Sequence, residues 1–487
     1  MRVVAGVDSS TTATKVELRD AGTGALLAMA RALHPPTSPP RSEQDPASWW
    51  EALREACHQA LAGGACRPGD VDGLSVAAQQ HGMVALDGAG EPVWPAKLWN
   101  DTQSAPDARV LIERLGGPAS WAASCGTVPV AAFTVTKLAW LRRCHPGAFA
   151  RLDRVLLPHD WLTWRLTGRS VTDRGDASGT GYWGPSEEGW RTDLLRLVDD
   201  QTAWEGALPE VLGPAEQAGE LGPGAAADLG LAPDGVAVGP GTGDNMAAAL
   251  GLGLAPGDVA ISIGTSGTVY AVAEAPTADP TGAVAGFADA TGRFLPLVCT
   301  LNATKVTDAW ARILGVDRAE LDSLALSAPP GAGGVVLVPY LDGERTPNRP
   351  LATGTLTGLR SDSSRAQVAR AAVEGVVCGL LDGLDSLAGA GVAVDGQLTL
   401  TGGGARSEAY RRVLADLSGR EVMVPEDQEM VARGACLQAA AVAGGVSVHD
   451  ILGTWPRPRE TGVEPSPGVD ATGIRERYKE AADRSAG

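Results

Sequence analysis

An α/β fold built from two related domains is predicted by three features of the sequence. The chain has 487 residues, more than one hydrophobic core usually serves, which indicates two or three domains. Short β-branched runs alternate with longer helical patterns along its whole length. A strand–turn–strand pattern at residues 4–18 also recurs at residues 259–273, opening each half of the chain. We therefore expect a duplicated fold in which two hairpin tips meet at a cleft between the domains.

The individual elements follow from local patterns. Strands are predicted where short apolar, β-branched runs are bounded by turn residues, namely at Arg2–Val7, Gly73–Ala77, Val236–Val238, Val259–Ile263, Val335–Pro339, Gln397–Thr401 and Glu421–Val424. Helices are predicted after Asp45-Pro46 and after Ser364, where a capping residue precedes apolar side chains at helical spacing. Two further helices are expected from Asp244 and over Glu408–Leu417.

Domain boundaries are expected at loop-rich segments. The Gly-, Pro- and Ala-rich stretch 213–235 leads to Gly239-Pro240-Gly241-Thr242-Gly243, which has the composition of a hinge. We predict an N-terminal domain at residues 1–243 and a C-terminal domain at residues 244–455. Residues 456–487 form a Pro- and Gly-rich tail that ends in a short charged helix, and we expect this tail to pack weakly.

Composition excludes several classes of protein. The net charge of −18 disfavours nucleic acid and anionic membranes as partners. The apolar stretches are all well short of the ~18 residues that span a membrane, and Asp8 comes too early for a secretory signal. Seven scattered cysteines without a Cys-x-x-Cys pair indicate reduced thiols in the cytoplasm rather than disulfides or a zinc site.

Both predicted hairpin tips consist of small residues whose backbone N–H groups can approach a phosphate closely. The tips are Ser9-Ser10-Thr11-Thr12 and Gly264-Thr265-Ser266-Gly267. One such turn alone is usually only a turn, but two copies at corresponding places favour phosphate binding.

Asp8 and Lys15 flank the first tip. A carboxylate beside a phosphate needs a hard cation between them, typically Mg²⁺ through water. The alternative is that Asp8 hydrogen-bonds its own turn. Lys15 either helps to neutralise the phosphate or is a solvated hairpin lysine.

Asp244 and Asn245 stand at the predicted start of a helix. Asp in this position is usually a helix cap. The preceding glycines, however, leave its carboxylate open to a ligand, and the helix field favours the ionised form that accepts a proton from an alcohol. Asn245 is placed to orient a hydroxyl group.

Polar side chains after a second strand point to sugar recognition. Gln80 and His81 follow the strand Gly73–Ala77, at the carboxyl end where α/β sheets bind ligands. Trp99, Asn100 and Asp101 add an aromatic ring and polar groups, although Trp99 equally suits the core. His81 is not assigned a catalytic role.

A triple glycine, Gly402-Gly403-Gly404, lies between the strand Gln397–Thr401 and the helix that begins at Glu408. This placement favours close approach of a planar or phosphorylated ligand. The chain has no Gly-x₄-Gly-Lys-Ser/Thr sequence, so a P-loop enzyme is excluded.

Together these segments resemble the FGGY carbohydrate kinases. The second signature of that family matches Gly354–Leu359 followed by Gln367–Glu374. The first is similar to Phe133–Leu141, with departures at Ala132 and Cys144. Four further segments are most similar to family members that act on a ketopentose: Gln80–Gly82, Leu98–Asp101, Asp173–Thr180 and Gly243–Asn245. The resemblance covers roughly residues 1–450.

The resemblance implies a fold and a set of roles. The fold is the two-domain actin/hexokinase/heat-shock ATPase type, with duplicated ribonuclease-H-like domains. Asp244 would be the catalytic base and Asp8 would assist Mg²⁺ and phosphate. The sugar would contact Gln80, His81, Trp99, Asn100, Asp101 and Asn245. ATP would lie near Thr11, Thr12, Lys15, Thr265, Ser266, Gly403, Gly404 and Glu408.

The expected reaction is transfer of a phosphoryl group from ATP to a ketopentose. Ribulose, gluconate and glycerol kinases share the scaffold and stay open as alternatives. From another class, the same ATPase fold also serves chaperones and nucleotide-gated binding proteins. The sequence leaves the oligomeric state open, with a homodimer as one alternative.

Overall fold

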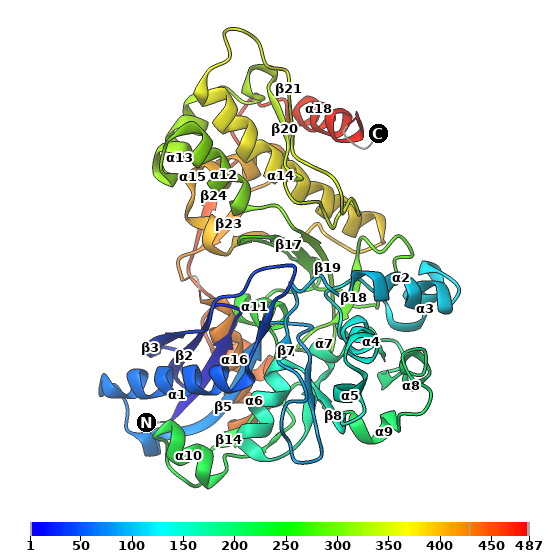
Figure 1. Cartoon of the computed structure of the whole chain (residues 1–487). Helices are drawn as coiled ribbons and strands as arrows, with labels where there is room; N and C mark the ends of the chain where they lie inside the picture. The colour runs from blue at the N-terminus through cyan, green and yellow to red at the C-terminus, as the bar shows by residue number, and fades with distance from the viewer. Residues whose placement is uncertain (1, 428, 485–487) are drawn as a thin grey trace. The chain divides into compact units, whose positions relative to one another are not determined.

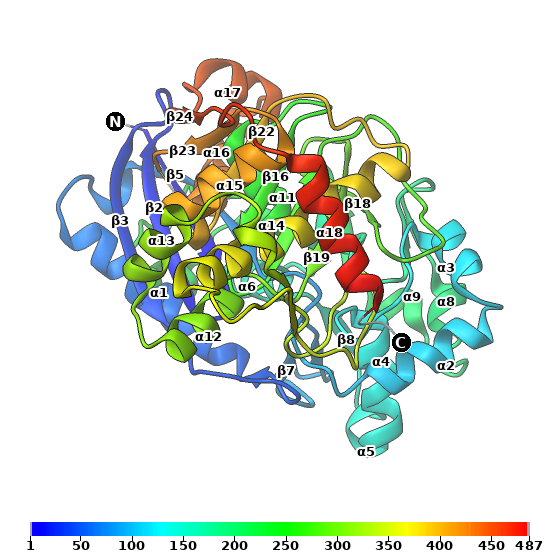
Figure 2. The same ribbon diagram turned by 90° about the horizontal axis from the view of Figure 1, so that it is seen from above.

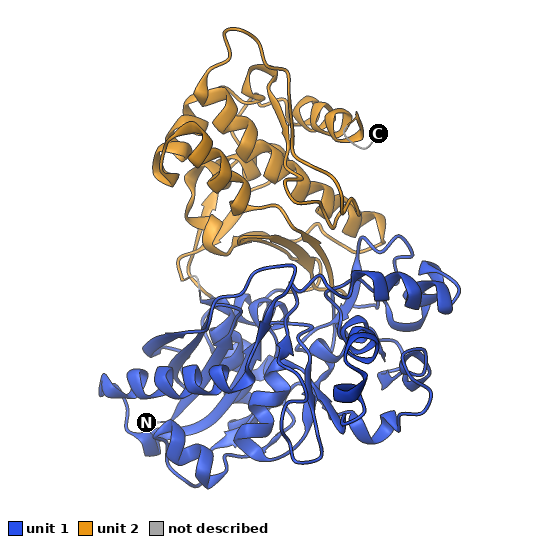
Figure 3. Cartoon of the chain, viewed as in Figure 1, with its two compact units in different colours: residues 1–254, 274–295, 429–457 blue, residues 255–273, 296–428, 458–487 orange. Residues whose placement is uncertain are grey.

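The computed structural model describes residues 2–427 and 429–484 and divides the chain into two compact units (Figure 3). Unit 1 comprises residues 1–254, 274–295 and 429–457, and unit 2 comprises residues 255–273, 296–428 and 458–487. The boundary predicted after residue 243 lies within unit 1, directly before helix α11 (Asp244–Leu252). The domain ranges 1–243, 244–455 and 456–487 stay predictions.

Unit 1 contains a mixed sheet whose strand order is β13-β14-β5-β1-β2-β3, with β15 also pairing β5. Strand β1 is antiparallel to β2 and parallel to β5, and β14 and β15 are parallel to β5 as well. The bounds are β1 Val3–Ser9, β2 Ala13–Asp20, β3 Leu26–Leu33, β5 Val71–Ala78, β13 Gly219–Glu220, β14 Ala237–Val238 and β15 Thr242–Gly243.

Helices α1 (Pro46–Ala62) and α16 (Met430–Gly444) cover the sheet of unit 1 (Figure 1). Alternate residues of β1, Val3, Ala5 and Val7, share one buried cluster with side chains of α1 such as Trp49. The intervening Gly6 faces α16, where a Cβ would lie 2.2 Å from the carbonyl oxygen of Ala432. Glycine at position 6 therefore lets a helix from the far end of the chain pack closely on the first strand.

Unit 2 repeats this connectivity. Its sheet runs β19-β17-β16-β22-β23-β24, and β16 is antiparallel to β17 and parallel to the later strand β22. The bounds are β16 Val259–Ile263, β17 Gly267–Ala271, β19 Phe294–Thr300, β22 Leu398–Thr401, β23 Val422–Pro425 and β24 Glu460–Val463. Because β1, β2 and β5 follow the same pattern, the predicted duplication of a strand–turn–strand unit is confirmed.

The predicted strands and helices are confirmed with shifts of one or two residues at their ends. All seven strand predictions coincide with β1, β5, β14, β16, β20 (Val336–Val338), β22 and β23. Asp45 caps α1, and Ser364 caps α14 (Arg365–Gly389) through a capping box with Gln367. The helix predicted at Glu408–Leu417 is α15 (Glu408–Ser418).

The prediction that the tail packs weakly is wrong. Strand β24 pairs antiparallel with β23 at the edge of the sheet of unit 2. Helix α18 (Ala471–Arg484) packs against β20 (Figure 1) and, at its first turns, next to α15 (Figure 2), and it buries Ile474, Tyr478 and Ala481. The sequence signal was misread because these few apolar residues are spread thinly among many charged ones.

The remaining helices and strands connect this framework. They are β4 Glu43–Gln44, β6 Val84–Leu86, β7 Ala96–Lys97, α2 Ala105–Arg114, α3 Pro118–Cys125, α4 Thr134–Cys144, α5 Pro146–Phe149, β8 Arg154–Leu156, α6 Pro158–Thr167, β9 Val171–Asp173, α7 Arg174–Ala177, β10 Trp183–Gly184, β11 Gly189–Trp190, α8 Thr192–Leu195, α9 Trp204–Ala207, β12 Glu210–Leu212, α10 Pro223–Leu229, β18 Ala285–Ala288, α12 Thr304–Leu314, α13 Arg318–Ser327, β21 Thr355–Thr357 and α17 Val448–Thr454.

Within the described residues, no single helix is long and apolar enough to cross a membrane. Helices α16 and α17 meet the length and composition criteria only as a pair, and they are bent by 111° where they join.

Candidate active site

Three neighbouring parallel strands of unit 1 end at the same edge of the sheet. Asp8 of β1 and Thr242 of β15 are both in register with Ala77 of β5. The residues that follow these strand ends are therefore neighbours, and they include Gln80 after β5 and Asp244 after β15. The edge is the carboxyl end of the parallel strands, as the sequence predicts.

Asp244 is the first residue of α11, and Gly243 is the residue at the cap position. The alternative that Asp244 serves as the helix cap is therefore wrong. The residue is half-buried, and its Oδ1 accepts hydrogen bonds from the backbone N–H of Asn245 at 2.8 Å and from the side-chain Nδ2 of Asn245 at 2.9 Å. The same Nδ2 donates to Oε1 of Gln80 at 2.8 Å. Three predicted site residues are thus joined in one chain of hydrogen bonds.

Burial, together with the negative charge of Asp8, raises the pKa of Asp244 to about 7. The hydrogen bonds from Asn245 act in the opposite direction and do not cancel this effect. A carboxylate with a pKa near neutrality is suited to accept a proton from an alcohol during a reaction and to release it afterwards.

Asp8 is 4% exposed and forms an ion pair across the first hairpin. Its Oδ2 lies 3.3 Å from Nζ of Lys15, the residue directly opposite it on β2, and Lys15 also pairs with Glu429 at the start of α16. Burial raises the pKa of Asp8, against the opposing charge of Lys15. Burial lowers the pKa of Lys15, but the two carboxylates outweigh it and raise the pKa overall. In this structure the charge of Lys15 is neutralised by these carboxylates, so its assignment to the nucleotide stays a prediction.

The carboxylate of Asp8 is a hard oxygen donor of the kind that Mg²⁺ prefers, and it is close enough to Asp244 for its charge to raise the pKa of that residue. Among the described residues no group of three or more His, Cys, Asp or Glu side chains is arranged to hold a metal ion by itself. Mg²⁺ in phosphoryl-transfer enzymes commonly uses one or two carboxylates and completes its shell with water and substrate phosphates. A buried aspartate with a like-charged neighbour is consistent with that mode of binding.

The first hairpin tip is tied to the neighbouring loops. Oγ1 of Thr11 donates to Oε1 of Gln79 at 3.2 Å and accepts from the indole N–H of Trp99 at 3.0 Å. Trp99 therefore lies beside the first hairpin tip, at the border of the candidate site, and does not belong to the core. Thr12 is exposed at the tip.

His81 is held in an unusual backbone conformation by its neighbours. Its φ angle is 64°, a region that non-glycine residues seldom adopt. Nδ1 lies 2.8 Å from the carbonyl oxygen of Gly179, and the ring contacts Phe133 and Phe287 at centroid distances of 4.9 and 5.4 Å. Such local strain is often found at functional sites because the surroundings must enforce it.

Three side-chain amides in this region present buried polar atoms that lack a hydrogen-bond partner among the described residues. They are Nε2 of Gln79, Nε2 of Gln80 and Oδ1 of Asn100. Buried polar groups are nearly always hydrogen-bonded in proteins, to water or a ligand where protein partners are missing. Two donors and one acceptor of this kind suit a polyhydroxyl ligand.

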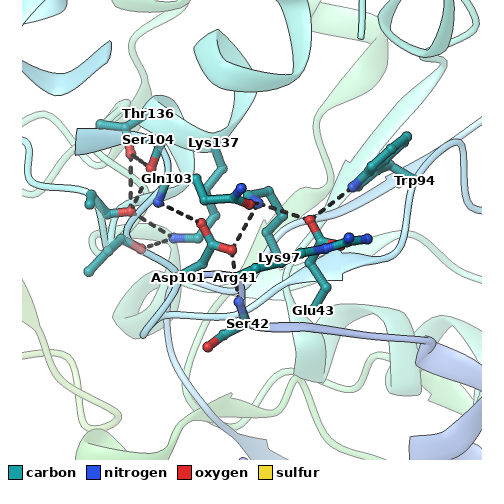
Figure 4. A network of polar contacts seen from close by, with 12 residues as sticks. Arg41, Ser42, Glu43, Trp94, Lys97, Asp101, Gln103, Ser104, Thr136 and Lys137 are labelled. Carbon is teal, nitrogen blue, oxygen red and sulfur yellow. Dashed lines mark hydrogen bonds and ion pairs between the residues drawn. The ribbon is translucent and has the colours of Figure 1, made fainter. Parts of the chain in front are cut away.

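The structure does not bring Asp101 together with these residues. Its carboxylate is fully buried and accepts from Nζ of Lys97, from the backbone N–H of Ser42 and from the backbone N–H of Gln103, at 2.9 to 3.0 Å (Figure 4). Lys97 is also fully buried and pairs with Glu43 at 3.0 Å. Asp101 thus anchors the loop that carries Trp99 and Asn100, and its predicted contact with the sugar stays a prediction.

In unit 2, the second hairpin tip and the triple glycine share one strand edge. Thr265 and Ser266 follow β16, and Gly403 and Gly404 follow the parallel strand β22. A Cβ at Gly404 would lie 2.3 Å from Cγ2 of Ile263, the last residue of β16, so glycine is required for this contact. Gly403 faces open space, and Glu408 is exposed at the start of α15. The five predicted nucleotide residues of unit 2 therefore lie along one edge.

Two groups of charged residues near the site were missed from the sequence. Glu429 reaches Lys15 from 414 residues away, and no local pattern signals this pairing. His159 lies among three aspartates, but a lone histidine two residues into a helical pattern carries no distinctive signal.

Comparison with known proteins identifies the family. The model of the N-terminal domain of the FGGY family of carbohydrate kinases matches residues 3–251, and the model of its C-terminal domain matches residues 259–443. The chain belongs to the FGGY family of carbohydrate kinases. It is therefore a sugar kinase, and the resemblance found in the sequence is confirmed.

Curated and solved members of the family match nearly the whole chain. The xylulose kinase of Streptomyces coelicolor is 48% identical over 453 residues, which cover 93% of this chain and 90% of that protein. The xylulose kinase of Streptomyces rubiginosus is 46% identical over 487 residues, which cover 100% and 95%. The crystal structure of xylulose kinase from Bifidobacterium adolescentis superimposes with a TM-score of 0.85 at 40% identity and covers 99% of each chain. The predicted actin/hexokinase-type fold is confirmed.

Replacing His81 should weaken binding of the sugar without affecting ATP. Asn is the best replacement because it tolerates a positive φ angle, whereas Ala would add backbone strain. We expect His81→Asn to raise the KM for the sugar about 10-fold, the value of roughly one lost hydrogen bond, with the KM for ATP unchanged.

Steady-state kinetics with each substrate varied in turn provides the measurement. His58→Asn, on the exposed face of α1, is the matched control and should behave as the unmodified enzyme. An unchanged KM for the sugar in His81→Asn would remove His81 from the sugar site.

Proposed function

We propose that this protein is a xylulose kinase, which transfers the γ-phosphoryl group of ATP to D-xylulose and forms D-xylulose 5-phosphate and ADP. The observation that carries the proposal is the position of Asp244, a carboxylate with a pKa near 7 that is linked through Asn245 to Gln80. Identity of 46–48% to two xylulose kinases over nearly the full chain supports the choice of sugar.

The chemistry assigned to unit 1 is the activation of a sugar hydroxyl. Gln80, His81, Asn100 and Asn245 would hold the hydroxyl groups of the ketopentose, and Trp99 would line the pocket. Asp244 would accept the proton of the C5 hydroxyl as its oxygen attacks the γ-phosphorus. Phosphoryl transfer needs little covalent assistance from the protein, so holding the hydroxyl in line and removing its proton are the main tasks.

The phosphate-binding role is assigned to both hairpin tips. The side chains of Thr11 and Thr12 in the first tip, and of Thr265 and Ser266 in the second, are small. They leave the backbone N–H groups of the tips accessible to phosphate oxygens. Gly403, Gly404 and Glu408 would lie near the rest of the nucleotide. Mg²⁺, held near Asp8 through water, would supply positive charge to the β- and γ-phosphates when bound.

A coupled assay of ADP release over D-xylulose, D-ribulose, L-ribulose, gluconate and glycerol tests the choice of sugar. We expect the highest kcat/KM with D-xylulose. A higher value with any other sugar would reassign the substrate within the family. ADP release stimulated by peptide instead of sugar would favour the chaperone-like alternative, which family membership disfavours.

The activity should fall at acidic pH through protonation of Asp244. Because its pKa is raised to about 7, the carboxylate is ionised above this value and protonated below it. Only the ionised form accepts a proton, so kcat/KM should rise with pH up to about 7 and then level off. The measurement is kcat/KM from pH 5.5 to 9. A profile that is flat down to pH 5.5 would mean that Asp244 has an ordinary pKa or is not the base.

We also propose a cytoplasmic location, supported by the seven cysteines, which are all free thiols. A homodimer stays a prediction, which light scattering of the purified protein tests.

A further inference from the structure

A buried cluster of four ionisable side chains lies behind the proposed sugar site in unit 1. His159, the second residue of α6, has its Nε2 3.1 Å from Asp160, 3.5 Å from Asp173 and 3.4 Å from Asp176. All four side chains are at most 2% exposed. The segment Asp173–Thr180 was singled out in the sequence, but the proposed reaction gives it no role.

Burial of this cluster costs free energy, so it is a poor way to stabilise the fold, and this favours a functional role for the cluster. Taking charges out of water is expensive even when they are paired. Burial alone lowers the pKa of His159, but the charges of the three aspartates raise it to about 9, so the imidazole is a cation at neutral pH. Burial also raises the pKa of Asp176 well above its usual range.

One end of the cluster holds the turn that carries Asp244. Asp173 accepts a hydrogen bond from Oγ1 of Thr242 at 2.7 Å, two residues before Asp244. The ring of His159 packs on the same turn, because a Cβ at Gly241 would lie 2.5 Å from its Nδ1. The φ angle of Gly241 is +79°, so this turn needs glycine both for its conformation and for the contact.

The other end of the segment holds His81. Asp173 caps α7 by accepting from the backbone N–H groups of Gly175 and Asp176, which fixes the start of the segment. The backbone N–H of Gly179, just beyond α7, donates to the carbonyl oxygen of Asp176 at 2.9 Å, and the carbonyl oxygen of Gly179 lies 2.8 Å from Nδ1 of His81. A Cβ at Gly179 would lie 2.6 Å from that nitrogen. One short segment therefore touches both the base-bearing turn and the sugar-contacting histidine.

We propose that His159 and the segment Asp173–Gly179 form a positioning element that fixes Asp244 and His81 relative to each other, and so aligns the sugar hydroxyl with its base. His159 is a positioning residue, since it acts through Asp173 and Thr242. The inference rests on the proposed function for the identity of the base and the sugar contact.

The link between the cluster and the base can be cut without changing any charge. Thr242→Val removes the hydroxyl that Asp173 accepts from, and Thr242→Ser keeps it. A misplacement of reacting groups by about 1 Å costs up to ~100-fold in rate, so we expect Thr242→Val to lower kcat about 10- to 100-fold with the KM for the sugar nearly unchanged. Thr242→Ser should restore most of the activity.

His159→Gln should affect both ends of the element. It removes the imidazole whose Nε2 lies 3.1 to 3.5 Å from all three aspartates, so we expect a lower kcat together with a higher KM for the sugar. Thr163→Val is the matched control, because Thr163 is fully buried on the same helix and its hydroxyl has no hydrogen-bond partner among the described residues. Its kinetics should be those of the unmodified enzyme.

The full chain is first assayed on the five sugars, and the variants are then assayed on the sugar that it phosphorylates best. A preferred sugar other than D-xylulose would overturn the proposed function and leave this test intact. Equal kcat values in Thr242→Val and the unmodified enzyme, or equal losses in the Val and Ser variants, would overturn the positioning role. The Thr242 pair decides the question even if His159→Gln does not fold.

Discussion

Asp244→Asn should lower kcat by about 10² to 10⁴-fold, the usual contribution of a general base, while both substrates still bind. The amide keeps an oxygen at the place of Oδ1, so it can still accept the hydrogen bonds from the backbone and side chain of Asn245. It cannot take a proton from an attacking hydroxyl. ADP release at pH 8, where the carboxylate is ionised, is the measurement.

The same variant should be more stable than the unmodified protein above neutral pH. In the folded protein the pKa of Asp244 is raised to about 7, above its value in the unfolded chain. The folded state therefore binds this proton more tightly than the unfolded chain does. The stability that comes from this proton is fully present below about pH 4, near the pKa of Asp in the unfolded chain, and is lost as the pH rises from about 4 to about 7. Asn carries no charge at any pH and avoids this loss. The melting temperature of Asp244→Asn should exceed that of the unmodified protein at pH 8, and the difference should shrink toward pH 4.

Asp193→Asn provides a matched control with the opposite sign. Asp193 also lies in the first turn of a helix, but its hydrogen-bonded pairing with Arg191 lowers its pKa. Its substitution should leave kcat unchanged and should not stabilise the protein at pH 8. If Asp244→Asn retains near-normal turnover, the base must be sought among other residues.

The sequence was sufficient for the framework because its signals are local. Each predicted strand is a short apolar run, and α1 and α14 begin at capping residues that the structure uses as caps. The register of β1, β5 and β15 then follows from sheet geometry and places Asp8, Gln80 and Asp244 at one edge. Most of the candidate site was therefore predictable.

The remaining features depend on contacts between distant segments. The charge of Lys15 is neutralised by Glu429, which comes to the sheet on α16. The sequence gives no sign that the carboxylate of Asp101 is buried and paired with Lys97, and its predicted contact with the sugar stays a prediction. Alternation and spacing show which residues face inward, but not which buried charges pair with each other.

Asp8→Asn should increase the Mg²⁺ concentration needed for half-maximal activity about 10- to 100-fold, the usual effect of a residue that holds a metal through its outer shell. The fold should be retained, since Lys15 keeps its second partner, Glu429. The measurement is kcat as a function of Mg²⁺ concentration at saturating ATP and sugar. Asp72→Asn, which breaks an exposed ion pair with Arg2 on the same sheet, should leave that dependence unchanged.

Lys15→Met separates a role toward the metal from a role in the ion pair. If Asp8 serves only as the partner of Lys15, removal of either residue should cause a similar loss that added Mg²⁺ does not restore. If Asp8 attracts the metal, removal of Lys15 should leave the carboxylate of Asp8 more available to the metal. The reason is that the ammonium group of Lys15, 3.3 Å from this carboxylate, no longer competes with the metal for it. The Mg²⁺ requirement should then rise in Asp8→Asn and stay level or fall in Lys15→Met. Opposite responses of the two partners of one ion pair cannot come from loss of the pair itself, so they would assign Asp8 to the metal.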